Sequence, residues 1–144
     1  MFSQLTEFTA PRRAFGAALL AAAALGLAGC AALMPKTPEQ VVRERAEQRW
    51  AALIDGDFDK AWTYTQPGYR AVVKQRDYHK RFGGAGQWMG VQIHDVTCEA
   101  ERCKVRIRLT TKVMIPSFMG KEVSGYMDES WVRDEGQWWY YQSL

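Results

Sequence analysis

The spacing of apolar positions changes once along the chain, near residue 88. Before that point apolar residues recur every three or four positions over 38–54, which predicts an amphipathic helix. Thr37 and Gln40 around Pro38 are typical of a capping box with proline in the first turn. The apolar stripe of this predicted helix consists of Val42, Ala46, Trp50, Leu53 and Ile54.

Two shorter helices are expected next. Asp55-Gly56-Asp57 is typical of a helix end followed by a new helix cap, and it predicts a second helix from Phe58. Gln66-Pro67-Gly68 predicts a turn, and a third helix follows between Ala71 and Phe82. The glycines after Phe82 follow a helix and precede a strand, the reverse of a phosphate-binding loop.

From Trp88 onward the period is two, which predicts antiparallel strands joined by short turns. The inward positions of the two middle strands are Val105, Ile107, Leu109 and Val113, then Val123, Met127 and Trp131. Residues 137–141 form a closing aromatic strand. Three helices followed by about four antiparallel strands predict an α+β fold with the helices packed on one face of the sheet.

Residues 14–33 form an uncharged, alanine-rich run long enough to span a bilayer. Arg12 and Arg13 precede the run, and small residues end it beside Cys30, as in a cleaved secretory signal. Leu27-Ala28-Gly29-Cys30 resembles the lipobox of bacterial lipoproteins. The resemblance implies lipid on Cys30, cleavage after Gly29, and a mature chain that is anchored to a membrane without crossing it. The alternatives are an uncleaved signal anchor and a buried helix.

These features divide the chain into a signal peptide (1–29), a lipidated tether (30–37) and an α+β domain (38–144). Enterobacterial lipoproteins with aspartate after the modified cysteine stay in the inner membrane. Ala31 takes that place here and predicts the outer membrane, facing the periplasm. The net charge of the whole chain is +3, and removal of Glu7, Arg12 and Arg13 with the signal peptide leaves +2. The compartment excludes nucleic acid as a partner.

Cys98 and Cys103 flank a polar loop between two predicted strands. In a hairpin with so short a loop the two thiols can face each other, and the periplasm is oxidising, so a structural disulfide is expected. A redox-active cysteine pair is the first alternative, but such pairs are more typically Cys-x-x-Cys. A zinc site is the second alternative, but His79 and His94 do not show the spacing of a zinc finger. We expect neither a metal nor a cofactor.

The segments 51–62, 66–70 and 136–139 resemble NTF2-like (SnoaL-like, cystatin-like cone) domains. The resemblance covers most of residues 38–142 through the order of the elements. It implies a curved sheet wrapped around the helices, with a conical pocket between them. Members of this family include isomerases, dehydratases, binding modules and accessory domains of envelope proteins, so the fold does not settle the function.

Enzymes of this family use Asp, His or Tyr inside the cone. The candidate residues of these types are Asp77, Tyr78, His79, His94, Asp95, Tyr126 and Asp128. A carboxylate in an apolar cone could abstract a proton beside a carbonyl. None of these residues aligns with a catalytic position of the family, so surface roles are expected and no catalytic residue is assigned.

Aromatic residues supply a candidate pocket lining or interface. The set is Trp50, Trp62, Trp88, Tyr126, Trp131, Trp138, Trp139 and Tyr141. Most of these side chains suit a core. On the last strand Trp138 and Tyr140 face away from Trp139 and Tyr141, so one pair is expected at solvent or at an interface, which indicates a homodimer, an envelope partner or a small apolar ligand.

Basic residues outnumber acidic ones between positions 60 and 94, and four more lie on one face of the strand over 104–112. A positive patch could meet anionic lipid or the cell-wall polymer, the alternative being an ordinary soluble surface. The sequence therefore predicts a membrane-anchored periplasmic lipoprotein that acts as a non-catalytic ligand-binding or assembly module. The alternative is an isomerase, dehydratase or cyclase.

Overall fold

The computed structural model describes residues 35–83 and 87–144, so Cys30 and the predicted signal peptide lie outside the described residues. The helices are α2 (Pro38–Ile54), α3 (Phe58–Thr63), α4 (Pro67–Val72) and α5 (Gln75–His79), followed by a 3-10 turn, η2 (Lys80–Phe82). The strands are β1 (Trp88–Glu99), β2 (Arg102–Lys112), β3 (Glu122–Asp134) and β4 (Gln137–Tyr140). A second 3-10 turn, η4 (Pro116–Phe118), lies between β2 and β3.

Helix α2 begins with the capping box that the sequence predicts. The backbone N–H of Gln40 donates to Thr37 Oγ1 at 3.3 Å, and the backbone N–H of Thr37 donates to Gln40 Oε1 at 3.0 Å. At the far end Gly56 has a φ of +74°, a left-handed conformation that glycine adopts without strain. Asp57 then caps α3 by accepting the backbone N–H of Lys60 at 3.0 Å.

The helix predicted between Ala71 and Phe82 is confirmed in part, because α5 and η2 lie within these bounds, but the turn predicted at Gln66-Pro67-Gly68 is wrong, because a further helix, α4, begins there. Pro67 starts α4, because proline suits the first helical position, and extended backbone at Val73 and Lys74 separates α4 from α5. The break has a packing reason. Tyr69 and Tyr78 are both buried, yet nine positions along one straight helix would place them on opposite faces, roughly 180° apart.

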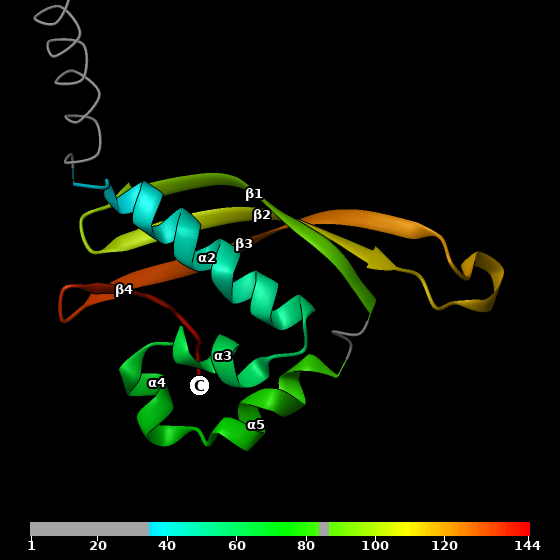
Figure 1. The fold of residues 1–144 in the computed structure, drawn as a ribbon, viewed down its shortest axis with the longest axis horizontal. Coiled ribbons are helices and arrows are strands. Elements are labelled where there is room, and N and C mark those ends of the chain that lie inside the picture. Colours follow the sequence, from blue (N-terminus) through cyan, green and yellow to red (C-terminus); the bar gives the residue numbers. More distant parts are fainter. Residues whose placement is uncertain (1–34, 84–86) are drawn as a thin grey trace, which may run out of the picture. The chain divides into compact units, whose positions relative to one another are not determined.

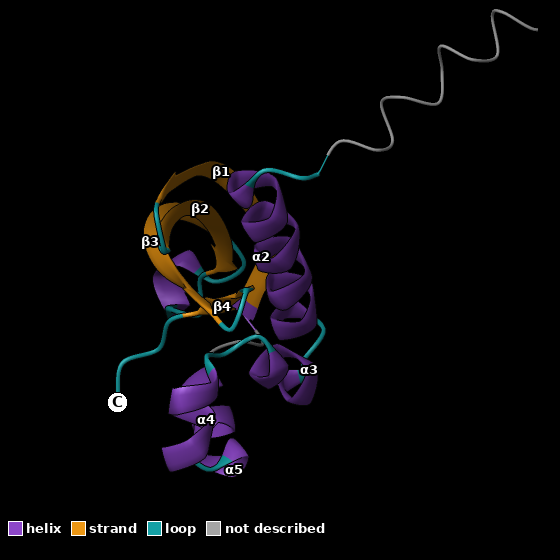
Figure 2. Cartoon of the chain, turned by 90° about the vertical axis from the view of Figure 1, so that its left-hand side faces the viewer, coloured by secondary structure: helices purple, strands orange, loops and turns teal. Residues whose placement is uncertain are grey.

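The four strands form one antiparallel sheet in the order β1-β2-β3-β4. Figure 2 shows that the sheet is strongly curved and that α2 lies along its concave side. The register of β1 and β2 skips a position between Ile93 and Asp95, which leaves a bulge at His94. The predicted α+β fold, with helices packed on a curved four-stranded sheet, is confirmed.

The core fills the space between the helices and the concave face. Strand β2 contributes alternate residues to it, and their partners on β3 face the same way: Cys103 with Trp131, Val105 with Glu129, and Ile107 with Met127. Helix α2 supplies the opposite side of the core with Val42, Ala46, Trp50, Ala52 and Leu53.

Strand β4 ties the sheet to the segment that connects α3 and α4. Tyr140 forms an isolated parallel bridge with Thr65. The backbone N–H of Tyr140 donates to the Tyr64 carbonyl at 2.8 Å, and the N–H of Gln66 donates to the Tyr140 carbonyl at 3.1 Å. The last strand therefore holds α3 and α4 against the sheet.

Candidate functional site

The centre of the fold holds a buried ion pair between α2 and β3. Arg49 Nη1 lies 2.8 Å from Glu129 Oε1, and both side chains are almost fully buried. Trp50 Nε1 donates to Glu129 Oε1 at 3.0 Å, and Trp131 Nε1 donates to Glu129 Oε2 at 3.4 Å. The Arg49 guanidinium also stacks 3.6 Å from the centre of the Tyr140 ring. We call these five residues and Tyr78 the buried polar cluster.

Burial and neighbouring charges shift the pKa values of the buried polar cluster in opposite directions. Burial is the largest single effect on Arg49 and lowers its pKa, but the Glu129 carboxylate together with Tyr78 and Tyr140 outweighs it, so the pKa of Arg49 is raised. Burial raises the pKa of Tyr78 and of Tyr140, because a phenolate would lose its hydration. The cluster is therefore held as one ion pair among neutral phenols.

The conical space implied by the family resemblance is occupied by side chains. The Trp62 and Tyr78 ring centres lie 5.1 Å apart, and those of Tyr78 and Phe82 lie 4.7 Å apart. The hydroxyl groups of Tyr69 and Tyr78 are buried, and neither has a hydrogen-bond partner among the described residues. Together with Arg49 Nε, these hydroxyls are buried polar groups without a hydrogen-bond partner among the described residues.

Of the acid–base candidates that the sequence offers, Tyr78 is the one that lies in the cone. Asp77 pairs with Lys80 at 2.7 Å on the surface, and this hydrogen bond lowers the pKa of Asp77. His79 Nε2 lies 3.0 Å from Asp59 Oδ1. Both residues take part in pairs with exposed neighbours on the helical side of the domain.

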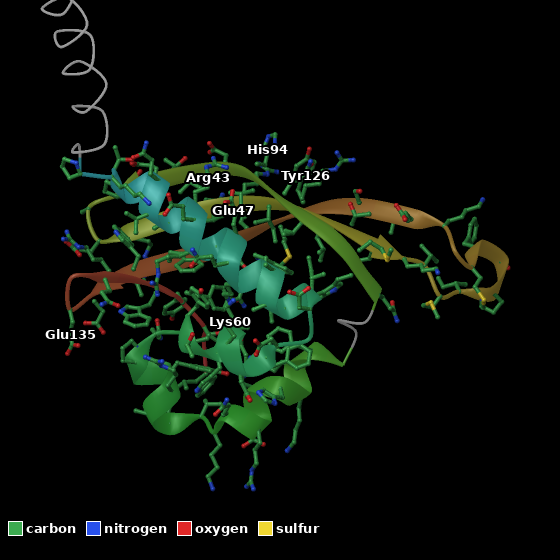
Figure 3. The ribbon with its side chains drawn as sticks, viewed as in Figure 1. Arg43, Glu47, Lys60, His94, Tyr126 and Glu135 are labelled. Atoms are coloured by element: carbon green, nitrogen blue, oxygen red, sulfur yellow. A yellow bond between two sulfur atoms is a disulfide. The ribbon has the colours of Figure 1, made fainter. Side chains whose placement is uncertain are left out.

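The remaining candidates meet on the outer face of the sheet, opposite the core. The rings of His94 and Tyr126 lie 5.3 Å apart, and the Arg106 guanidinium lies 5.5 Å from the Tyr126 ring (Figure 3). Asp95 is paired in register with Arg106. Asp128 binds Lys104 at 2.8 Å, and this hydrogen bond lowers the pKa of Asp128. The structure thus brings these residues together at an exposed, mainly basic surface.

The aromatic set divides into three environments. Trp50, Trp131 and Trp138 are buried, Trp62, Trp88 and Trp139 are half-buried, and Tyr126 and Tyr141 are exposed. Trp139 lies between two cations, with the Arg45 guanidinium 5.2 Å and the Arg70 guanidinium 5.0 Å from its ring. These side chains therefore do not line one common pocket.

Cys98 and Cys103 face each other across β1 and β2, with an S–S distance of 2.03 Å. The turn between them contains Ala100, whose φ is +45°. Cys103 is fully buried, so the disulfide closes the hairpin at the edge of the core.

Sequence reasoning missed Arg49 and Glu129. A signal for Glu129 was available, because it falls in the same alternation as Met127 and Trp131 and must therefore face inward. An acidic residue at a core-facing position requires a buried cation or hydrogen-bond donors. The sequence carries no comparable signal for Arg49, since α2 has many charged residues.

An open groove lies on the core-facing side of the sheet, beyond the helices. We call it the distal groove; its volume is about 320 Å³. Its lining consists of Leu109, Thr111, Val123, Ser124, Gly125, Tyr126 and Met127. Figure 1 shows that this end of β2 and β3 extends past the helices. Met127 and Val123 are 43% and 52% exposed, although both continue the alternation that buries Trp131.

Exposed apolar side chains gather around this groove. Of the eleven large hydrophobic residues exposed in the described part of the chain, seven lie between positions 114 and 127. Within residues 35–83 and 87–144, no helix is long and apolar enough to cross a membrane. The same residues contain no cluster of three or more His, Cys, Asp or Glu side chains that could hold a metal ion.

No protein-family model matches the chain, and no curated protein sequence matches it. Solved structures are similar. A SEC-C motif containing protein from Psychrobacter arcticus is 11% identical with a TM-score of 0.56, over 81% of this chain and 64% of that one, so the chain spans less than two thirds of that protein. A SEC-C motif containing protein from Rhodopseudomonas palustris is 18% identical with a TM-score of 0.52, over 74% of this chain and 76% of that one.

A third similar structure is a putative NTF2-like transpeptidase from Campylobacter jejuni, 11% identical with a TM-score of 0.49, over 69% of this chain and 96% of that one. At identities this low, the likeness to the two SEC-C motif containing proteins shows a shared fold and says nothing about activity. Helices packed on a curved antiparallel sheet are the architecture that the sequence resemblance to NTF2-like domains implies, and they are the architecture of this chain.

Proposed function

We propose that this protein is a lipid-anchored periplasmic protein whose domain binds a small apolar ligand in the distal groove, without catalysis. The observation that carries the proposal is the concentration of exposed large hydrophobic residues around this groove. Exposed apolar patches on a single domain are typical of binding surfaces, and ligand sites combine an apolar lining with a few polar groups. Thr111 supplies such a polar group here, whereas the Ser124 hydroxyl lies 2.8 Å from Thr110 Oγ1.

The state of Glu129 also favours binding over acid–base chemistry. A general base must reach a substrate proton, but both oxygens of this carboxylate already accept hydrogen bonds from Arg49, Trp50 and Trp131. The distal groove is open to solvent, and its lining is mainly apolar.

Two features support the proposed location. The lipobox-like segment ending at Cys30 would provide the membrane anchor. The Cys98–Cys103 disulfide suits an oxidising compartment such as the periplasm. Under this proposal residues 1–29 are removed, and the mature chain faces the periplasm from the outer membrane.

The alternative is an isomerase, dehydratase or cyclase that works in the cone. One observation favours it: the buried Tyr69 and Tyr78 hydroxyls have no partner among the described residues. A neutral phenol beside a fixed charge is a group that can stabilise a developing enolate oxygen. In this case a ligand would contact Tyr78 and leave the distal groove empty.

Native mass spectrometry of the protein extracted from its own membranes tests the proposal. We expect loss of residues 1–29, acyl mass on Cys30, and an additional apolar molecule bound non-covalently. Met127→Asp places a charge in the groove and should abolish that adduct. Gln92→Asp, on the exposed outer face of β1, is the matched control and should keep it.

The absence of an adduct in the unsubstituted protein, or an adduct that Met127→Asp retains, would refute binding in the distal groove. Loss of the adduct in Tyr78→Phe, with retention in Met127→Asp, would favour the cone. A full-length chain without acyl mass would contradict the anchor independently of ligand binding.

A further inference from the structure

The loop between β2 and β3, residues 113–120, is a closed structure with its apolar side chains turned outward. We call it the hairpin tip. The backbone N–H of Val113 donates to the Lys121 carbonyl at 2.7 Å, and the N–H of Gly120 donates to the Val113 carbonyl at 3.1 Å. The N–H of Phe118 donates to the Ile115 carbonyl at 2.9 Å, within η4. These three bonds close the base of the tip and fix the turn within it.

Four apolar side chains of the hairpin tip are each more than half exposed. They are Met114, Ile115, Phe118 and Met119. The tip lies at the end of the extended β2–β3 ribbon, past the helices (Figure 1), so the core does not cover these side chains. A turn with such a surface is unfavourable in water and suits an apolar environment.

Unpaired cations stand at the base of the hairpin tip. Arg108, Lys112 and Lys121 form no ion pair with any residue between 35–83 or 87–144. Glu122 is the one acidic residue over positions 108–122, so this stretch carries a net positive charge. Lys121 Nζ lies 5.3 Å from the centre of the Phe118 ring, so a cation sits directly beside an apolar side chain of the tip.

We propose that the hairpin tip inserts into the surface of a bilayer containing anionic phospholipid. The apolar side chains would enter the boundary between headgroups and acyl chains, while Arg108, Lys112 and Lys121 would bind headgroup phosphates. Lysine suits this position, because its stem packs against apolar groups while its charge stays at the interface. The N–H groups of Met114, Ile115, Ser117 and Met119 have no hydrogen-bond partner among the described residues, so the insertion is shallow and leaves the backbone at the level of the headgroups and water.

Charge distinguishes this occupant from a second copy of the chain. Two copies meeting at their hairpin tips would bring like cations together, which is unfavourable, whereas anionic headgroups complement them. Lys36, near the end of the predicted tether, shares a surface pocket with Gly136 of the β3–β4 turn, at the other end of β3 from the tip. With a lipid on Cys30, two contacts would therefore hold the sheet lengthwise along the membrane.

This inference shares with the proposed ligand-binding function its membrane location and the exposed apolar residues Met114, Ile115, Phe118 and Met119, which do not line the distal groove. Ser117→Cys places a thiol on the hairpin tip for an environment-sensitive nitrobenzoxadiazole label, because Cys98 and Cys103 are joined in a disulfide. The labelled mature protein is reconstituted in vesicles of phosphatidylethanolamine and phosphatidylglycerol that carry a spin-labelled lipid. A label at Ser143→Cys, near the C-terminus, is the matched control.

We expect the spin-labelled lipid to quench the tip label several-fold more than the control label. Lys112→Glu combined with Lys121→Glu should remove most of this quenching, as should replacement of the anionic lipid by phosphatidylcholine. Equal quenching of the two labels, or quenching that charge reversal leaves unchanged, would overturn the proposal. A tip label shielded from both the lipid quencher and aqueous iodide would also overturn it, because a protein partner or second copy would then cover the tip.

The state of Cys30 is read from the intact mass before reconstitution. If the chain is not acylated, co-flotation of the same protein with anionic vesicles, compared with Phe118→Asp, tests the tip alone. Circular dichroism of each variant confirms that its fold is retained. These experiments therefore distinguish a chain without a lipid anchor, a groove that binds no ligand and a tip that does not enter the bilayer.

Discussion

Arg49 of α2 and Glu129 of β3 are 80 positions apart in the chain, and their charged groups meet at 2.8 Å in the interior. Each charge loses its hydration on folding, and the partner compensates for that loss only while both are present. The two indole N–H groups that donate to Glu129 complete the compensation. The pair thus fixes how α2 sits on the concave face of the sheet.

Removing one partner of this pair should be far more harmful than removing both. Glu129→Gln or Arg49→Met is expected to lower the free energy of unfolding by about 3–5 kcal/mol, because an uncompensated charge or donor stays buried. The double variant Arg49→Met/Glu129→Leu should cost much less than the sum of the single variants. Urea unfolding followed by tryptophan fluorescence measures all three.

Lys104→Ala, which breaks an ion pair between exposed side chains, is the control for that series and should change stability little. Additive costs of the two single substitutions would show that Arg49 and Glu129 do not depend on one another.

Stability is expected to fall at alkaline pH because of the buried phenols. The folded state raises the pKa of Tyr78, and of Tyr140, above the ordinary tyrosine value near 10. Above that value the unfolded chain has released phenol protons that the folded protein still holds, so the free energy of unfolding decreases as pH rises. The contribution is complete below about pH 10 and is lost as pH rises through the folded-state pKa.

Denaturant unfolding between about pH 8 and pH 11 follows this loss directly. Tyr78→Phe should flatten the pH dependence, whereas Tyr126→Phe, at an exposed position, should leave it unchanged. An identical slope in the Tyr78→Phe variant would assign the alkaline loss to other groups.

The Cys98–Cys103 disulfide should contribute modestly to stability. It closes a loop with a sequence separation of 5, so the chain-entropy gain lies near the low end of the usual range, about 2 kcal/mol. Cys98→Ser/Cys103→Ser and reduction of the unsubstituted protein should lower the urea midpoint by similar amounts. A much larger effect of the double substitution than of reduction would instead reflect the loss of packing at the fully buried Cys103.

Helix starts and strand faces could be predicted from the sequence, because neighbouring residues determine them. Thr37 and Gln40 satisfy each other across one turn, and Asp57 caps the helix that follows it, so both helix starts could be predicted. Alternation likewise predicted the inward faces of β2 and β3. The break between α4 and α5 was missed because its cause is tertiary: Tyr69 and Tyr78 must both reach the core, and no local pattern states that requirement.

The candidate site was less predictable than the fold. The alternation of β3 predicts that Glu129 points into the interior. Its partner, Arg49, lies on a helix with many charged residues and can be identified only once α2 is placed on the sheet. The distal groove depends on where the helices stop covering β2 and β3, which no single element determines. The lipid anchor rests on the sequence alone, because Cys30 lies outside the described residues.

The hydrogen bonds that link Tyr140 to Tyr64 and Gln66 make the position of α3 and α4 depend on a strand that is synthesised long after them. Until β4 is synthesised, the segment between α3 and α4 has no strand edge to pair with. Docking of α3 and α4 therefore waits for a strand far along the chain, and such a delay is compatible with the export that we propose.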